Sequence, residues 1–145
     1  MPHVGHALAI FAAILWGLTY CLDERVLEGL SVAKLYFLHC ATGVVVAGLL
    51  LLAGGEPPGA LFRFDSGKTS PGLLALTLAT ATGAALAILW SIRLLGAGPS
   101  AVLEISYPLF VALFSVLFFG GRVPWPVLAG GAFIFIGAAI IVTAK

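Results

Sequence analysis

One acidic residue interrupts an otherwise apolar part of the chain. Glu104 is the only charged residue between Pro99 and Phe119. A carboxyl group among apolar residues is costly to keep charged, so this one could bind and release a proton. Pro108 follows four residues later and has no N–H to donate to the carbonyl of Glu104. A helix here is expected to kink at that point and to leave a carboxyl group beside a free carbonyl.

Other polar side chains recur near Glu104 at helical spacing. Tyr107 is one turn away, and Ser100 and Ser115 fall on roughly the same helical face. This interrupted polar stripe could serve a solute or a proton path. The alternative is that Glu104 lies near a membrane interface and reaches headgroup water.

Three further side chains are candidates for binding a solute or a proton. His39 lies about a third of the way along its apolar stretch and could pair with Glu104 or exchange protons near neutral pH. Trp16 and Trp90 could stack on an organic ligand. The alternative for His39 is a packed, hydrogen-bonded residue, and the alternative for both tryptophans is packing or an interfacial anchor.

Five apolar stretches contain these candidates, and each is close to the ~20 residues that a bilayer core requires. They predict an all-α polytopic membrane protein, a bundle of five transmembrane helices forming one domain over residues 1–145. The odd number places the termini on opposite sides of the membrane. The predicted spans are 5–22, 32–53, 72–95, 99–119 and 127–143.

Composition agrees with a membrane protein and excludes several other classes. The chain is 61% hydrophobic and only 9% charged, whereas soluble domains carry about a quarter charged residues. The net charge is +1 and no basic run is present, so no nucleic-acid partner is expected. No nucleotide-binding loop, nucleophile elbow or metal-binding motif occurs. We therefore expect neither an enzyme nor a bound cofactor or metal.

The basic residues give the five-span arrangement almost no preferred orientation. Arg63, Lys68 and Arg122 fall on one side, and the other four basic residues fall on the opposite side. A chain with so small a bias could insert either way, and two antiparallel copies would then form an inverted repeat. The alternative is that a partner or one helix fixes a single orientation. The four residues of the second side are Arg25, Lys34, Arg93 and Lys145.

Two sets of residues form a recognisable pattern along the chain. Segment 12–20 contains a Trp-Gly pair, and a second set runs from Leu94-Leu95-Gly96 through 107–113 to Phe119-Gly120-Gly121-Arg122 and continues into 130–137. Together these segments resemble the EamA family of the drug/metabolite transporter superfamily, and segment 12–20 is similar to its first-helix signature. The resemblance covers essentially the whole chain as one five-helix repeat.

This resemblance implies a secondary carrier for small metabolites, amino acids or drugs, located in the plasma or inner membrane. Most members fuse two inverted repeats around a central site, so a single repeat would form an antiparallel homodimer or a heterodimer with a related chain. Alternating access in that dimer would move the solute. Proton exchange at Glu104 is suggested by its place in an apolar stretch before Pro108, and not by the resemblance. Small molecules and membrane lipid are the other expected partners.

The chain also departs from the family pattern at three places. His39 stands near a position where members often carry Arg, and Arg122 follows Gly121 where members commonly have Glu. The first helix lacks the membrane acid of the related small multidrug resistance proteins. Two other functions therefore remain open: a non-transporting membrane subunit or assembly factor, and a flippase component for a lipid-linked sugar.

Overall fold

The chain folds into helices throughout the part that its structure describes. The computed structural model describes residues 2–55, 57, 59 and 70–143, and these residues form helices, turns and short connections without a β-strand. This confirms the predicted all-α class. The helices are α1 (Pro2–Gly29), α2 (Val32–Ala53), α3 (Pro71–Leu95), α4 (Ala97–Glu104), α5 (Tyr107–Phe119) and α6 (Trp125–Thr143).

Four helical segments are long and apolar enough to cross a membrane. They are Val4–Gly29, Val32–Ala53, Pro71–Leu95 and Ala97–Phe119, the last made of α4 and α5 together. The apolar part of α6, Trp125–Ile141, is shorter. At 1.5 Å per residue it is about 26 Å long, the lower limit for a span. The number of five spans stays a prediction.

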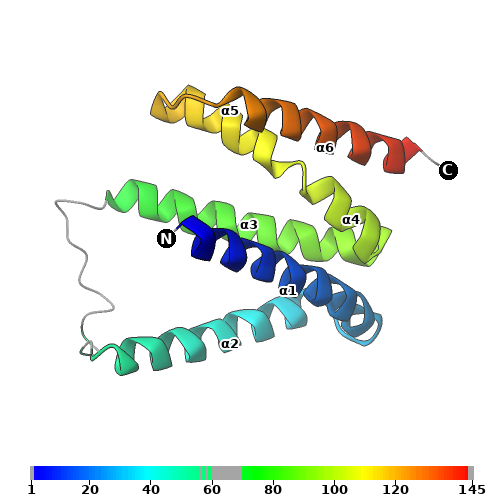
Figure 1. The fold of residues 1–145 in the computed structure, drawn as a ribbon. Coiled ribbons are helices and arrows are strands. Elements are labelled where there is room, and N and C mark those ends of the chain that lie inside the picture. The colour runs from blue at the N-terminus through cyan, green and yellow to red at the C-terminus, as the bar shows by residue number, and fades with distance from the viewer. Residues whose placement is uncertain (1, 56, 58, 60–69, 144–145) are drawn as a thin grey trace. The chain divides into compact units, whose positions relative to one another are not determined.

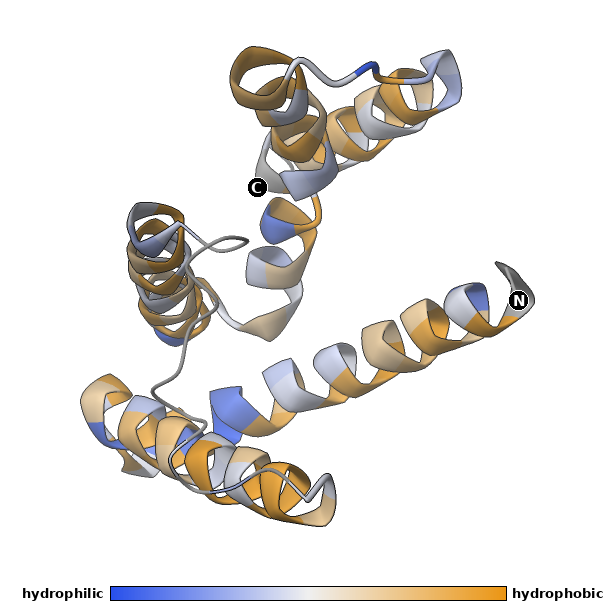
Figure 2. Ribbon diagram, turned by 90° about the vertical axis from the view of Figure 1, so that its left-hand side faces the viewer, coloured by the Kyte–Doolittle hydropathy of each residue, from blue (hydrophilic) through white to orange (hydrophobic). Residues whose placement is uncertain are grey.

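The long helices are apolar all round rather than along one stripe (Figure 2). Only 6–11% of each long span is buried within the chain. A helix that is apolar on every side needs a surrounding that is also apolar, such as lipid or another membrane helix. The chain is therefore an integral membrane protein whose outer helix surfaces are covered by lipid or by a second chain.

The helices divide between two compact units. The first unit consists of Met1–Arg25 and Ser91–Lys145, and the second is Val26–Trp90. The first unit thus holds most of α1, the end of α3 and all of α4, α5 and α6. The second holds the end of α1, all of α2 and most of α3.

In the first unit, α6 packs against both α4 and α5. Figure 1 shows α5 and α6 side by side and joined by a short turn. Gly131 allows the close approach, because a Cβ atom there would lie 2.5 Å from the Cδ2 atom of Leu109 on α5. The turn begins at Gly120, with φ of 61°, and the N–H of Gly121 donates to the carbonyl of Ser115 at 2.9 Å. This glycine pair ends α5 and reverses the chain.

In the second unit, local signals define the ends of α2 and the start of α3. Ser31 caps α2 by accepting a hydrogen bond from the N–H of Lys34 at 3.3 Å. After α2 the chain turns at Gly55, with φ of 74°. Pro71 is the first residue of α3, a position where the missing N–H costs no helical hydrogen bond.

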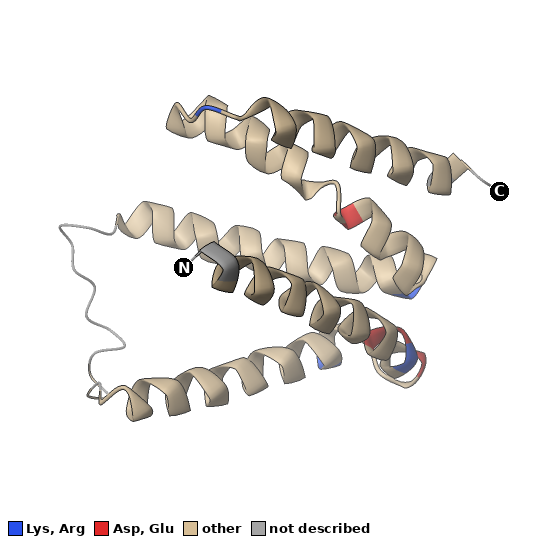
Figure 3. Cartoon of the chain, in the orientation of Figure 1, with Lys and Arg blue, Asp and Glu red and all other residues tan. Residues whose placement is uncertain are grey.

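The first helix is longer than its predicted span. The predicted span ends at Leu22, but α1 continues as a helix to Gly29. Polar residues do not stop a helix, and a span can project beyond the lipid. Figure 3 shows charged residues of both signs near this end of α1. Three basic residues used to count charges, Arg63, Lys68 and Lys145, lie outside the described residues, as does most of the connection 54–71.

Candidate functional site

The predicted fourth span is two helices with a break between them. α4 ends at Glu104, Ile105 and Ser106 form a turn, and α5 begins at Tyr107 with Pro108 in its first turn. The interruption is therefore larger than the expected kink. Pro108 cannot donate to the carbonyl of Glu104, and the turn is instead closed by a bond from the N–H of Ser106 to the carbonyl of Leu103 at 3.3 Å.

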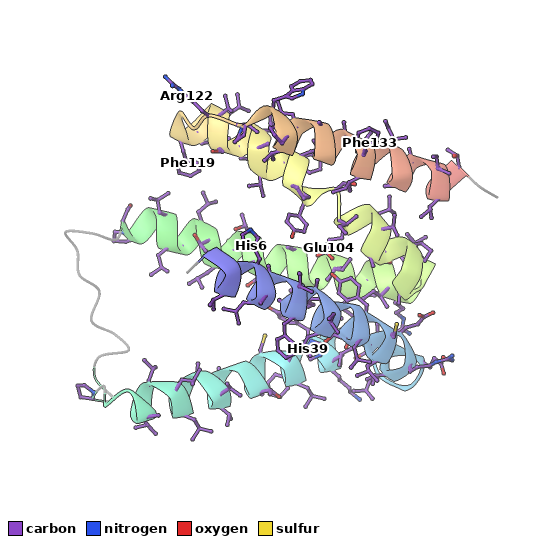
Figure 4. All side chains as sticks on the ribbon, viewed as in Figure 1. His6, His39, Glu104, Phe119, Arg122 and Phe133 are labelled. Carbon is purple, nitrogen blue, oxygen red and sulfur yellow. The ribbon has the colours of Figure 1, made fainter. Side chains whose placement is uncertain are left out.

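At this break the Glu104 carboxylate meets a side chain of the first helix. The hydroxyl of Tyr20, on α1, donates a hydrogen bond to Oε2 of Glu104. Tyr20 is buried, with 7% of its surface exposed, whereas Glu104 itself is exposed. Figure 4 labels Glu104 at the C-terminal end of α4. The contact joins residues 84 positions apart in the chain.

Trp16 lies one turn before Tyr20 and packs against its ring. The two ring centroids are 6.0 Å apart, and the ring planes meet at 66°, an edge-to-face arrangement. Trp16 is 61% exposed, so most of its surface is not covered by the rest of the chain. The structure therefore links a predicted ligand-stacking residue to Glu104 through Tyr20.

A second carboxylate from α1 holds the beginning of α4. The N–H of Ala97 donates to Oε2 of Glu24 at 3.1 Å. The positive end of the helix dipole favours an acid at this place. Gly96 is the single residue between α3 and α4, with φ of 86° and ψ of 167°. A Cβ on Gly96 would lie 3.1 Å from Oε1 of Glu24. The sequence had suggested a longer link, ending at Pro99.

A pair of serines connects α4 to the end of α3. The Oγ atoms of Ser91 and Ser100 are 2.8 Å apart, and Ser100 is completely buried. An inward serine that already has a hydrogen-bond partner stabilises helix packing. The geometry therefore gives Ser100 a packing role, and its predicted place on a solute path stays a prediction.

The rest of the predicted polar stripe lies beyond the break. Tyr107 begins α5 and is 59% exposed, and Pro108 follows it. Helical spacing relates side chains only within an uninterrupted helix. The periodicity that put Ser100, Glu104 and Tyr107 on one face does not continue through Ile105 and Ser106, so the stripe is not a continuous helical face.

The two remaining candidates belong to the second unit. His39 lies on an exposed face of α2, and Trp90 on α3 is 53% exposed. The proposed pairing of His39 with Glu104 stays a prediction.

Two contributors to the site were absent from the predicted set. They are Tyr20 and Glu24, both on α1. Their spacing of four residues puts them on one face of α1. Nothing local in the sequence points to their partners on α4, because those lie more than seventy residues away. Among the described residues, no group of three His, Cys, Asp or Glu side chains could hold a metal ion.

The arrangement has the chemistry of a reversible acid–base or hydrogen-bonding site. A carboxylate can accept several hydrogen bonds, and the structure shows one, from Tyr20. Protonation of the carboxylate or an N–H group of a solute could compete with the phenol for it. The exposed Trp16 packs on Tyr20, and the turn at Ile105 and Ser106 directly follows Glu104.

Comparison with known proteins gives a family and no individual relative. The EamA-like transporter family matches residues 3–143, nearly the whole chain. No curated protein and no solved structure gives a significant match.

Proposed function

This chain belongs to the EamA-like transporter family, and from that premise we propose that it carries small organic solutes across the cell membrane by alternating access. The working form is an antiparallel dimer of two five-helix chains. Glu104 exchanges a proton during the cycle. Family membership supports the transporter class, and the site supports the role of Glu104.

The observation that carries the proposal is the contact between Tyr20 and Glu104 at the break between α4 and α5. Acids inside membrane segments are rare and usually mark ion or substrate paths. Broken helices are also common at the binding sites of transporters. Here an acid and a helix break occur together. Of the predicted spans 32–53, 72–95, 99–119 and 127–143, only 99–119 contains an acidic residue among its described residues, and that residue is Glu104.

Two observations support a dimer. Each long span is only 6–11% buried within the chain, so much helix surface remains for a second copy. The basic residues on the two sides of the membrane differ by one, three against four, so both orientations are accessible. A second, inverted copy would complete a two-repeat carrier.

The transport mechanism is tested in liposomes loaded with a pH-sensitive dye. Members of a panel of amino acids and organic amines are added one at a time, and solute-driven proton movement is recorded. We expect at least one compound to drive proton flux in the wild type and Glu104→Gln to lose that flux. Glu28→Gln, an acid near the end of α1, is the matched control and should retain it. Equal flux in Glu104→Gln and wild type would remove Glu104 from the mechanism.

The dimer is tested by labelling both termini from each side of intact membranes and by mass measurement in mild detergent. Access to each terminus from both sides, with a mass of two chains, is the expected result. A stoichiometric unrelated partner without a homodimer would instead indicate a membrane subunit or assembly factor. Co-purified lipid-linked sugar, with no flux of any compound in the panel, would indicate a flippase component.

A further inference from the structure

The first helix contacts α4 at both of its ends. Tyr20 donates to Glu104 at the C-terminal end, and Glu24 accepts from the N–H of Ala97 at the N-terminal end. Tyr20 and Glu24 are one helical turn apart on α1. The eight residues of α4 extend about 12 Å along the helix axis. The two contacts therefore hold α4 at both of its ends.

A helix as short as α4 depends on such contacts for its position. Isolated helices of fewer than ~12 residues are marginal, because few hydrogen bonds repay the cost of nucleation. α4 is also separated from α3 by Gly96 alone and from α5 by the turn at Ile105 and Ser106. Packing against α6 and the Ser91–Ser100 pair support it, and the two side-chain contacts from α1 add a hydrogen bond at each end.

We propose that Tyr20 is a positioning residue for Glu104: the bond from its hydroxyl weakens when Glu104 takes up a proton, and it is displaced when an N–H group of a solute binds the same carboxylate oxygen. This inference rests on the proposed function for the role of Glu104. Loss of the Tyr20 bond frees the C-terminal end of α4 from α1. The hydrogen bond from the N–H of Ala97 to Glu24 still holds the N-terminal end. Binding at Glu104 thereby changes one hydrogen bond between α4 and α1.

Few other titratable groups could substitute for Tyr20 in this role. α6 carries none, α5 carries only Tyr107, and α4 carries only Glu104. At the far end of α4 lie Glu24 and its charged neighbours on α1, together with Arg93 near the end of α3. His6 is near the opposite end of α1, more than three turns before Tyr20.

A hydrophobic carbodiimide tests the positioning role without requiring a known solute. The reagent enters membranes and adds to carboxyl groups in their protonated form, and peptide mapping by mass spectrometry gives the rate at Glu104. We expect Tyr20→Phe to raise that rate by roughly tenfold, the effect of losing one hydrogen bond to a charged group. Phenylalanine keeps the ring that packs on Trp16. Tyr36→Phe removes a tyrosine hydroxyl on α2 and should leave the rate unchanged.

A second variant separates positioning from a general loosening of the fold. Glu104→Asp shortens the side chain by one methylene and withdraws the carboxylate from Tyr20. Modification at this position should therefore be fast, and adding Tyr20→Phe should not increase it further. A purely structural role for Tyr20 would instead accelerate modification on both backgrounds, which would overturn the proposal.

A failure of the positioning role of Tyr20 can be distinguished from a failure of the proposed transport function. Equal modification of Glu104 in wild type and Tyr20→Phe would disprove the positioning role, even if Glu104→Gln loses proton flux. Conversely, a tenfold increase in modification would stand even if no compound in the panel drives flux. If Tyr20→Phe does not fold, the comparison of Glu104→Asp with wild type decides, because slow modification of both would contradict the contact.

Discussion

The two helices that share the predicted fourth span, α4 and α5, are fixed by different kinds of contact. α4 is held by polar groups: the Glu24 cap, the Ser91–Ser100 pair and the Tyr20–Glu104 bond. α5 has no charged residue, and its close contact is apolar, with Leu109 against Gly131 of α6. Its phenylalanine rings follow one another along an exposed face, with centroids 6.3 Å and 5.7 Å apart.

This difference suggests that α4 and α5 have different roles within one span. Polar contacts between helices are directional and can exchange partners, whereas apolar packing in lipid depends on shape. A segment that must respond to a proton or solute benefits from the first kind, and a segment that anchors it benefits from the second. α4 is thus suited to change its contacts, and α5 with α6 to stay in place.

The largest expected effect on stability is at the entrance to α4. Gly96→Ala should destabilise the fold by about 1–3 kcal/mol, because φ of 86° with ψ of 167° is a region that essentially only glycine occupies. The new Cβ would also lie 3.1 Å from the Glu24 carboxylate. Thermal unfolding in detergent, followed by far-UV circular dichroism, measures the change.

Gly98→Ala is the matched control for Gly96→Ala. Gly98 is helical, and a Cβ there would meet nothing within 4 Å. Alanine is the better helix former, so this variant should be as stable as wild type or more stable by up to about 1 kcal/mol. Equal destabilisation by both substitutions would contradict the strained geometry of Gly96.

The second prediction concerns the apolar contact of α5. Gly131→Ala should destabilise by about 1–2 kcal/mol, because its Cβ would overlap the end of the Leu109 side chain. Trimming that side chain in Gly131→Ala/Leu109→Ala should make the two substitutions non-additive. Gly130→Ala, where a Cβ would be in open space, is the control. Strict additivity in the double variant would show that the two residues do not touch.

Sequence patterning was most successful where the physics is local. Apolar length predicted the long helices, and α3 and α6 begin at Pro71 and Trp125, one and two residues before the predicted limits. The ends set by polar contacts were missed. α1 extends past Leu22, and α4 begins at Ala97 because Glu24, from a distant helix, accepts its first N–H.

The candidate site shows the same limit. A lone acid in an apolar stretch made Glu104 a candidate, and Pro108 predicted a kink where the structure has a two-residue turn, Ile105 and Ser106, between α4 and α5. Tyr20 could not be assigned to Glu104 from the sequence, since no local rule pairs residues 84 positions apart. The face shared by Ser100 and Tyr107 was inferred from an unbroken helix that does not exist.

A smaller effect is expected at the polar cap of α4. Glu24→Ala should cost about 0.5–2 kcal/mol, the usual effect of removing a cap, and should expose the N–H of Ala97 to exchange. Hydrogen exchange in lipid nanodiscs, resolved at the start of α4, measures this directly. Glu28→Ala removes an acid one turn further along α1 and should leave the Ala97 amide protected. Protection of that amide in both variants would mean that the Glu24 carboxylate does not cap α4.

The smallest effect is expected on the aromatic face of α5. Phe114→Leu keeps an apolar side chain and loses two ring contacts, to Phe110 and Phe118. The ring is 46% exposed and meets an apolar surrounding in either state, so the loss should be about 0.5–1 kcal/mol in stability. Proton flux and Glu104 modification should both match wild type. A strong loss of dimer mass in this variant would instead place the second copy on α5, and the division between a responsive α4 and an anchoring α5 would then extend to assembly.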